Sequence, residues 1–348
     1  MSYEYPVDAE MARLTIILGI VIVTLVYKQT GMTLGGVIVP GYLALFVTEP
    51  FHVLSTLGIA VLAFLIVHNW IKKRYMLNGR RLFEIEILVA LVLQINWNAL
   101  MLLGSQYSPE TVVLYGIGFV IPGLITHEMG RQGIRRTLYS TLFGSLVIFL
   151  IIMPLAALEE KLPRALIAVT TSPILRTQPN LYAYPLGLLP IAIVVSIIID
   201  LLAYYHLKMR PGGFVTAAYI ALFYPRPWDL LFVIVAALLT YLFVNILTDR
   251  YTLVFGRTKL GMLILVGVVI AWLLEIIVIR VTDGLFTPWS GFVVIMPMLT
   301  SLLANGFDRQ GLKSTVAALG LSSGVVWLIM QALVWGLSLL DWYKYFVL

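Results

Sequence analysis

Apolar runs, separated by short polar segments, divide the chain into two series of similar spacing. Six runs lie at about 11–27, 31–48, 51–70, 82–104, 112–126 and 137–158, and six more at about 186–205, 212–225, 228–247, 260–282, 286–303 and 314–340. Because a straight crossing of a bilayer takes about 20 residues, these runs predict an all-α, polytopic integral membrane protein. The runs at 31–48, 112–126 and 212–225 are short and contain Gly or Pro, so each is either a broken helix buried in protein or a re-entrant hairpin.

The two series carry the same motifs in the same order. Gly35-Gly36 followed by Tyr42 returns as Gly212-Gly213 followed by Tyr219, and Gly79-Arg80 returns as Gly256-Arg257 at the same spacing. Arg131-Gln132-Gly133 returns one residue further on as Arg309-Gln310-Gly311. Such an internal repeat decides the architecture. We predict a first membrane repeat at 1–158, an extracytoplasmic Pro-containing linker at 159–185 and a second, diverged membrane repeat at 186–348.

Charge placement favours twelve crossings with the N-terminus outside. In that arrangement 16 of the 23 basic residues face the cytoplasm, as the positive-inside rule requires: Lys28, Lys72, Lys73, Arg74, Arg80, Arg81, Arg131, Arg135, Arg136, Lys208, Arg210, Arg250, Arg257, Lys259, Arg309 and Lys313. Re-entry of the second and fifth runs would instead place the basic loop at 71–81 outside. Six crossings return each copy to its starting side, so the copies are predicted to be parallel repeats related by an axis along the membrane normal.

Composition limits the chemistry that the chain can perform alone. It is 61% hydrophobic and 11% charged, against about 25% charged in soluble domains, and it has no cysteine. The four histidines show no metal-ligand spacing, and we find no Ser–His–Asp grouping and no dinucleotide fingerprint. The segment 306–315 resembles a phosphate-binding loop but has one residue too many and no preceding strand. We therefore predict no cofactor, no metal and no nucleic-acid partner, and expect any soluble catalysis to come from another protein. The acidic N-terminus predicts a retained first helix, not a signal peptide.

The repeated arginines are the leading candidates for partner or product binding. Arg80, Arg81 and Arg257 follow a glycine in corresponding loops, and Arg can grip a carboxylate with two parallel hydrogen bonds. Topology and lipid headgroup contact explain positive charge in such loops but not the repeated Gly-Arg pair.

Arg131-Gln132 and Arg309-Gln310 form the second candidate group. Helix capping accounts for the Gly and Arg of this motif, since Arg is favourable at a helix C-terminus. Capping does not account for the repeated Gln, so a polar recognition patch and a capping role are both open. The glycines and prolines of the repeated blocks are predicted to be structural: Gly35, Gly36, Pro40, Gly41, Gly79, Pro122, Gly123, Gly133, Gly212, Gly213, Gly256 and Gly311.

Polar residues inside the apolar runs form the third group, because charge at membrane depth is expensive and is by default a functional hypothesis. Asp200 and Glu275 lie deep in their runs, and Glu275 corresponds to Asn98 at the repeat spacing. Glu84 and Glu86 lie near the cytoplasmic end, where they can pair with Arg80 or Arg81. A satisfied polar contact between helices is the alternative reading for each of them.

Several blocks taken together resemble the CapC/PgsC family, the small membrane subunit of bacterial poly-γ-glutamate synthases. They are Thr30-Gly31, Val39-Pro40-Gly41-Tyr42-Leu43-Ala44, Asn78-Gly79-Arg80-Arg81, Gly116 to Ile125 with Ile121-Pro122-Gly123, and Arg131-Gln132-Gly133. The second copy matches less well, with Ala217-Ala218 in place of Pro-Gly. The expected family member is a single copy, so the chain resembles a covalent dimer with one diverged half.

The resemblance implies partners and a location. Family members work in the bacterial cytoplasmic membrane with a cytosolic ATP-dependent amide ligase of the Mur-ligase type (CapB/PgsB) and an extracellular subunit (CapA/PgsA). It implies that this chain docks the ligase and helps to pass a polyanion outward, and that it is not catalytic alone. A secondary transporter and a purely structural membrane anchor are the alternatives. The polymer and the presence of further copies in the complex are left open.

Overall fold

A computed structural model describes residues 9–105, 114–159, 182–208, 212–213, 215–251, 257–289, 292 and 295–339, and every regular element within them is helical. The chain separates into two compact units, one of residues 3–160 and one of residues 161–348 together with the first two residues. Each unit is described by itself. Most of the predicted linker, residues 160–181, lies outside the described residues.

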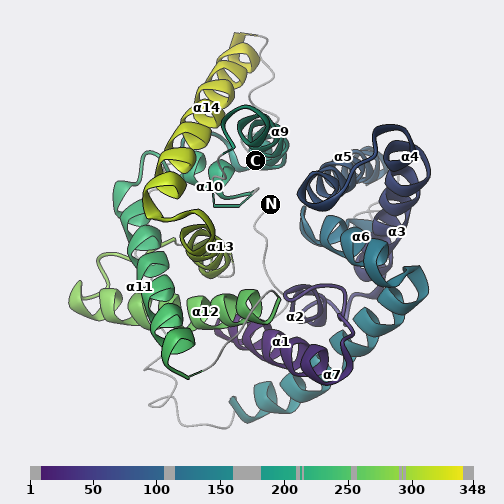
Figure 1. Ribbon diagram of the computed structural model, residues 1–348, viewed down its shortest axis with the longest axis horizontal. Helices are drawn as coiled ribbons and strands as arrows, with labels where there is room; N and C mark the ends of the chain where they lie inside the picture. The colour runs from purple at the N-terminus through teal and green to yellow at the C-terminus, as the bar shows by residue number, and fades with distance from the viewer. Residues whose placement is uncertain are drawn as a thin grey trace. The chain divides into compact units, whose positions relative to one another are not determined.

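The described residues of the first unit form long helices and short ones, which Figure 1 labels. In chain order they are α1 (Ala9–Thr30), α2 (Val39–Ala44), α3 (Pro50–Ile66) continued by the π-turn η1 (Val67–Ile71) and α4 (Lys72–Tyr75), α5 (Gly79–Ser105), α6 (Ile121–Gln132) and α7 (Ile134–Glu159).

The second unit repeats this order. It consists of the 3₁₀ turn η3 (Leu186–Leu188), α9 (Leu189–Leu207), α10 (Thr216–Leu222), α11 (Pro227–Tyr251), α12 (Arg257–Val281), α13 (Ile295–Gln310) and α14 (Leu312–Leu339).

Eight helical stretches in the described residues are long and apolar enough to cross a membrane. Four belong to each unit, which makes the chain an all-α protein with several membrane helices. The expected six membrane segments per copy are not confirmed by this criterion. The short runs hold helices of only 6 residues in α2, 12 in α6, 7 in α10 and 16 in α13, because Gly and Pro precede or open each of them.

Each short helix of the first unit is wedged between two long ones. Helix α2 packs against α1 and α7, whereas α6 packs against α3 and α5. The contact is close enough to require glycine: a Cβ on Gly41 would lie 3.1 Å from the Ile16 Cα, and one on Gly123 would lie 2.7 Å from the Ile87 Cα. The Val-Pro-Gly and Ile-Pro-Gly blocks therefore bring backbones together, as small residues do between membrane helices.

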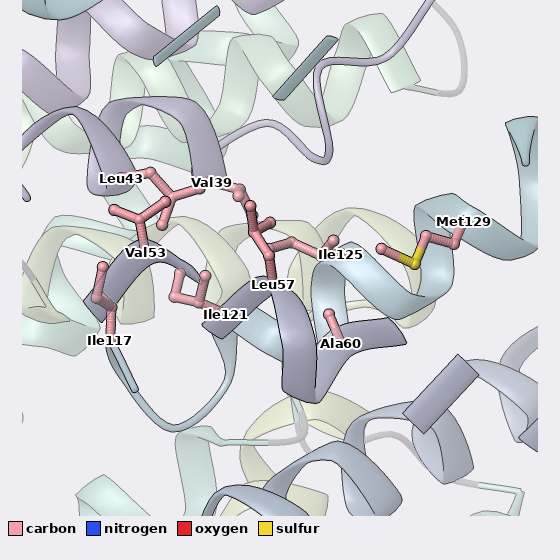
Figure 2. Close-up of a cluster of buried hydrophobic side chains, with 9 residues drawn as sticks. All are labelled: Val39, Leu43, Val53, Leu57, Ala60, Ile117, Ile121, Ile125 and Met129. Carbon is pink, nitrogen blue, oxygen red and sulfur yellow. The ribbon is translucent and has the colours of Figure 1, made fainter. Parts of the chain in front are cut away.

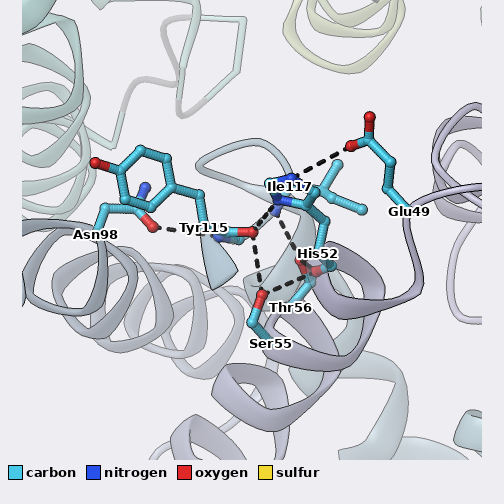
Figure 3. Close-up of polar contacts among 8 residues, drawn as sticks. Glu49, His52, Ser55, Thr56, Asn98, Tyr115 and Ile117 are labelled. Atoms are coloured by element: carbon cyan, nitrogen blue, oxygen red, sulfur yellow. Dashed lines mark hydrogen bonds and ion pairs between the residues drawn. The ribbon is translucent and has the colours of Figure 1, made fainter. Parts of the chain in front are cut away.

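We call residues 31–49 the first broken segment and residues 114–132 the second, because each joins irregular backbone to a short helix. The irregular part of the second is held by side chains of α3 and α5 (Figure 3). The Tyr115 carbonyl accepts hydrogen bonds from His52 Nδ1 at 2.5 Å and Ser55 Oγ at 3.1 Å, and the Ile117 amide donates to Thr56 Oγ1 at 2.7 Å. The flanking Gly116 amide donates to Asn98 Oδ1 and the Leu114 carbonyl accepts from Trp97 Nε1. Irregular backbone is tolerated at membrane depth when protein satisfies it in this way.

The second unit packs in the same order. Helix α10 lies against α9 and α14, and α13 lies against α11 and α12. Its first broken segment falls partly on residues 209–211 and 214, which lie outside the described residues. The repeat read from the sequence thus corresponds to a repeated helix arrangement.

Candidate functional site at the arginine end of the first unit

Three parts of the first unit meet at one end, which we call the arginine end: the end of α1 with residues 28–33, the start of α5 with residues 79–86, and the end of α6 with residues 127–132. The contact is direct. Thr33 bonds Glu128 and Gln132, and His127 bonds Glu86. The repeated arginines of this unit, Arg80 and Arg131, therefore lie at the same end of the fold.

Arg80 is already engaged by a carboxylate of its own helix. Its Nε bonds the buried Glu84 one turn later in α5, and Gly79 opens that helix with a φ of +61°. The neighbouring Arg81 is exposed. The sequence expectation that a glutamate here pairs with Arg80 is met by Glu84, because residues four apart share a helix face.

Arg131 is more open to solvent than Arg80. Its side chain is 45% exposed and its Nη1 lies 3.8 Å from Glu128 Oε1. Arg135 and Arg136, at the start of α7, are exposed beside it. The outer rim of the arginine end is therefore strongly basic, and Arg131 is partly open to solvent there.

Gln132 holds the chain together at this end. Its Nε2 donates to the Thr33 carbonyl at 2.6 Å, and its Oε1 accepts the Thr33 amide at 3.2 Å. The Thr33 hydroxyl donates to Glu128 Oε2 at 2.6 Å. Both ends of the amide are thus occupied by the backbone of the first broken segment. We call these two hydrogen bonds between Gln132 and Thr33 the bracket. The bracket gives Gln132 a structural role, whereas the sequence had suggested recognition for this residue.

We expect Gln132→Leu to destabilise the first unit by about 1–3 kcal/mol, because it strands the Thr33 amide and carbonyl in a partly buried site. Thermal stability of the purified chain in detergent, followed by size-exclusion chromatography, measures the loss. Gln29→Leu, an exposed position at the end of α1, is the matched control and should leave stability unchanged. Equal stability of both variants would contradict the bracket.

A buried carboxylate between two imidazoles lies behind this rim. Glu86 of α5 is fully buried, with its Oε2 2.7 Å from His127 Nδ1 of α6 and its Oε1 3.7 Å from His68 Nε2 of η1. His68 occupies a π-turn, a distortion often found at functional sites. Aromatic rings enclose both imidazoles: Phe64 stacks on His68 and Phe83 meets His127 edge-on.

Gly130 provides the space for this cluster. A Cβ at that position would lie 2.8 Å from His68 Nε2 and 3.2 Å from Glu86 Oε1. An ionised or hydrogen-bonded carboxyl group buried at a membrane helix end is a functional candidate. Among the described residues no group of three or more His, Asp or Glu side chains has the arrangement of a metal site. Glu86 and His127 form a hydrogen-bonded pair, and His68 lies 3.7 Å from the other carboxylate oxygen.

The second copy replaces the cluster by neutral residues. At the repeat spacing His68 and Glu86 correspond to Asn245 and Leu263, and His127 corresponds to Asn305, one residue further on as in the Arg-Gln-Gly motif. Leu263 packs there in an apolar cluster with Val244 and Ala304. The second copy thus adopts the same helix order with neutral residues at these three positions.

The second-copy arginine motif is structurally simpler. Arg309 Nε donates to Asn305 Oδ1 at 3.3 Å, and Gln310 Nε2 donates to Thr315 Oγ1 at 3.1 Å. Lys259 and Asp308 form an ion pair nearby at 2.7 Å. Arg257 begins α12, but its side chain, like residue Gly256, lies outside what the structure describes. The segment 306–315 is helical on both sides of Gly311 and does not form a phosphate-binding loop.

The three intramembrane polar residues lie on three different helices, Asn98 on α5, Asp200 on α9 and Glu275 on α12. Asn98 accepts the Gly116 amide at 3.2 Å and so holds the second broken segment. Asp200 is fully buried in α9, and Glu275 is half-buried in α12. Of the structural glycines, Gly133 and Gly311 follow α6 and α13 with φ of +88° and +83°, which suits a helix end. Gly212 and Gly213 carry positive φ, as do Gly35 and Gly36 in the first copy.

Fold and site together define a polytopic α-helical membrane protein made of two copies of one unit with broken segments and a basic end. The family model for capsule biosynthesis CapC matches residues 18–138 and again 195–316. The chain belongs to the CapC family, in the form of a tandem duplication.

Two curated relatives agree with this assignment. The chain is 33% identical over 132 residues to the PGA biosynthesis protein CapC of Bacillus subtilis (strain 168). The aligned region covers 38% of this chain and 87% of that protein. The chain is 31% identical over 136 residues to the capsule biosynthesis protein CapC of Bacillus anthracis, with the same two coverages. Nearly a whole relative thus corresponds to well under half of this chain. No solved structure matches the chain.

Proposed function

We propose that the chain is a multi-pass subunit of a poly-γ-glutamate (or related polyamide) synthase in the bacterial cytoplasmic membrane. It docks a cytosolic ATP-dependent amide ligase of the Mur-ligase type and helps the polyanionic product to cross, with a CapA/PgsA-type subunit as a further partner outside. The match of both copies to the CapC family, and the printed names of its relatives, carry this proposal.

The docking face in this proposal is the arginine end, which faces the cytoplasm. Lys73 and Arg74 of the 71–81 loop are exposed, and so are Trp70, Tyr75 and Met76. Exposed aromatic and basic side chains together suit a membrane–water interface and an acidic surface above it. A growing chain of carboxylates would meet the same charges, with Arg131 more open to solvent than Arg80.

Replacing Arg80, Arg131, Arg257 and Arg309 together by Lys separates recognition from topology. Lysine keeps the positive charge that orients the loops but cannot form the paired hydrogen bonds of Arg. We expect normal insertion but polymer yield lowered about tenfold, the effect of about 1.4 kcal/mol in binding. The amount of chain in the membrane fraction measures insertion, and ATP-dependent glutamate incorporation by a co-expressed ligase measures polymer yield.

Single variants assign the effect. Arg131→Lys should account for more of the loss than Arg309→Lys, because the first copy keeps the fuller family pattern. Arg280→Lys is the matched control, since Arg280 is exposed in the last turn of α12, at the other end of that helix from Arg257. Full polymer output from the fourfold variant would remove the arginines from the site.

A secondary transporter is the second candidate, and the broken segments favour it, since such segments build many transporter sites. The two functions differ in their energy source. Polymer formation that requires ATP and a co-expressed ligase supports the synthase subunit. Uptake of a small solute by the purified chain in vesicles, without a ligase, supports the transporter. If the ligase stays fully active and the polymer is still exported when another membrane anchor holds the ligase in place of this chain, the chain is a purely structural anchor.

A further inference from the structure

The two broken segments of the first unit are alike in sequence and backbone. Residues 33–43 align without a gap on residues 115–125, so that Pro40-Gly41 falls on Pro122-Gly123. Three residues before each short helix stands a glycine with positive φ, Gly36 at +129° and Gly118 at +57°. The residues before the helices are also alike: Ile38 has φ −102° and ψ −29°, and Val120 has φ −101° and ψ −22°.

The helices around the two broken segments can be matched in the same way. If α1, α2 and α3 are exchanged with α5, α6 and α7, three observed packing pairs become three other observed pairs, while the α6–α7 pair has no equivalent among them. The α1–α2 pair becomes α5–α6, α2–α7 becomes α6–α3, and α1–α7 becomes α5–α3. The direct contact between α2 and α6 maps onto itself. This is the pattern of a two-fold axis that relates two halves of one unit.

The side chains that hold the broken segments follow the correspondence as well. Ser55-Thr56 of α3 and Ser140-Thr141 of α7 are equivalent pairs. Ser55 Oγ donates to the Tyr115 carbonyl at 3.1 Å, and Ser140 Oγ donates to the equivalent Thr33 carbonyl at 3.1 Å. Thr56 accepts the Ile117 amide, and Thr141 lies against the equivalent Gly35. Two independent contacts are thus repeated at opposite ends of the unit.

The two segments run in opposite directions. The first starts at the arginine end, where Thr33 contacts Gln132, and reaches the other end, where Ala44 packs with Met11 at the start of α1. The second starts beside His52 at the beginning of α3 and ends at Gln132. We propose that the first unit is an inverted pair of three-segment halves, residues 9–75 and 79–159, in which both broken segments cross the membrane, in opposite senses.

The halves meet at an apolar seal where both short helices begin. Val39 and Leu43 of α2 pack there with Ile117, Ile121 and Ile125 of the second broken segment (Figure 2). Inverted halves with discontinuous helices place a substrate passage at their interface in transporters, and apolar constrictions close such passages by excluding water. The seal is the closed constriction of an anion passage within the first unit. This part rests on the proposed transport of a polyanion, whereas the inverted topology does not.

Single cysteines test the topology, because the natural chain has none. With a membrane-impermeant thiol reagent on intact cells, Thr48→Cys and Leu114→Cys should be labelled. Met32→Cys, Arg131→Cys and the reference Asn78→Cys should be labelled only after permeabilisation. Protection of Thr48→Cys together with labelling of Asn78→Cys would show that the first broken segment re-enters, and would overturn the inverted pair whatever the protein's function.

A polar substitution in the seal tests the passage. In vesicles loaded with radiolabelled glutamate, Ile121→Ser should release it about tenfold faster than the unmodified chain, the effect of about 1.4 kcal/mol on a barrier. Ile148→Ser is the control and should not leak, because Ile148 of α7 is equally apolar and fully buried but packs elsewhere, with Met11 of α1 and Ala44 of α2. Equal release from both variants, or no release from Ile121→Ser in a chain that labels as predicted, would overturn the passage while leaving the topology intact.

Discussion

Gly123→Ala is expected to destabilise the first unit strongly, although it adds a single methyl group. The new Cβ would lie 2.7 Å from the Cα of Ile87 in α5. That atom is backbone, so relief requires the α5–α6 pair to move apart along its length. Overpacking of this kind costs about 1–3 kcal/mol or more. Thermal inactivation in detergent, followed by the monodisperse fraction, should shift by roughly 2–4 °C for each kcal/mol lost.

Gly58→Ala is expected to stabilise the first unit instead, and it serves as the control. A Cβ at Gly58 in α3 meets nothing within 4 Å, so the substitution gains helix propensity of about 1 kcal/mol without a clash. The two variants change composition identically and differ only in what the methyl group touches. A Gly123→Ala chain as stable as Gly58→Ala would mean that α5 and α6 are not packed as closely as described.

The sequence predicted the long membrane helices, the duplication and the breaks at 31–48, 112–126 and 212–225, because these depend on local hydropathy and on Gly and Pro. It did not single out the run of α13 as short. It did not predict how the breaks are stabilised. The bond from Gln132 to Thr33 joins residues 99 apart, and that from Ser55 to the Tyr115 carbonyl joins residues 60 apart. No local pattern encodes such pairs. The gapless likeness of 33–43 to 115–125 was nevertheless present in the sequence, and the strong likeness between the two copies obscured it.

The acidic residues of α5 show a second limit. Glu84 and Glu86 were grouped as partners for the neighbouring arginines. Residues two apart on a helix point in different directions, so only Glu84 reaches Arg80. Glu86 faces α6 and the π-turn, where His127 and His68 meet it. Helix geometry separates the two roles from sequence alone, but the histidines come from elements 18 residues before and 41 after, and only the fold brings them together.

The copies also differ at the end opposite the arginines, where an acidic and a basic side chain meet in exchanged positions. Glu49 lies 3.3 Å from His52 in the first copy, and at the repeat spacing Arg226 lies 2.5 Å from Asp229 in the second. The buried Asp229 also accepts the Trp289 amide at 2.7 Å. A contact between an acidic and a basic residue is retained while the order of the two along the chain is reversed, as expected when the contact stabilises the start of α3 and of α11. The His–Glu–His cluster behaves differently, since its charge is lost altogether in the second copy.

Removing one histidine from that cluster is expected to be worse than removing the whole cluster. His127→Asn leaves the buried Glu86 with a weakened partner, and a buried polar group that loses its hydrogen bond costs about 1–3 kcal/mol, more if it is charged. The triple variant His68→Asn, Glu86→Leu, His127→Asn copies Asn245, Leu263 and Asn305 of the second copy. It removes the buried carboxylate along with its partners, so stability should return to near that of the unmodified chain. Thermal stability of the three purified chains in detergent measures this.

Polymer yield from the same variants then separates a structural cluster from a functional one. We expect the triple variant to insert and fold normally but to lose polymer output, because a carboxylate buried at membrane depth is costly and is a functional candidate. That result would place Glu86 and its two neighbouring histidines in the functional site of the first copy. Full output from that variant would exclude the cluster from the site. Instability equal to that of His127→Asn would instead show that the first copy, unlike the second, cannot pack α5 against α6 without it.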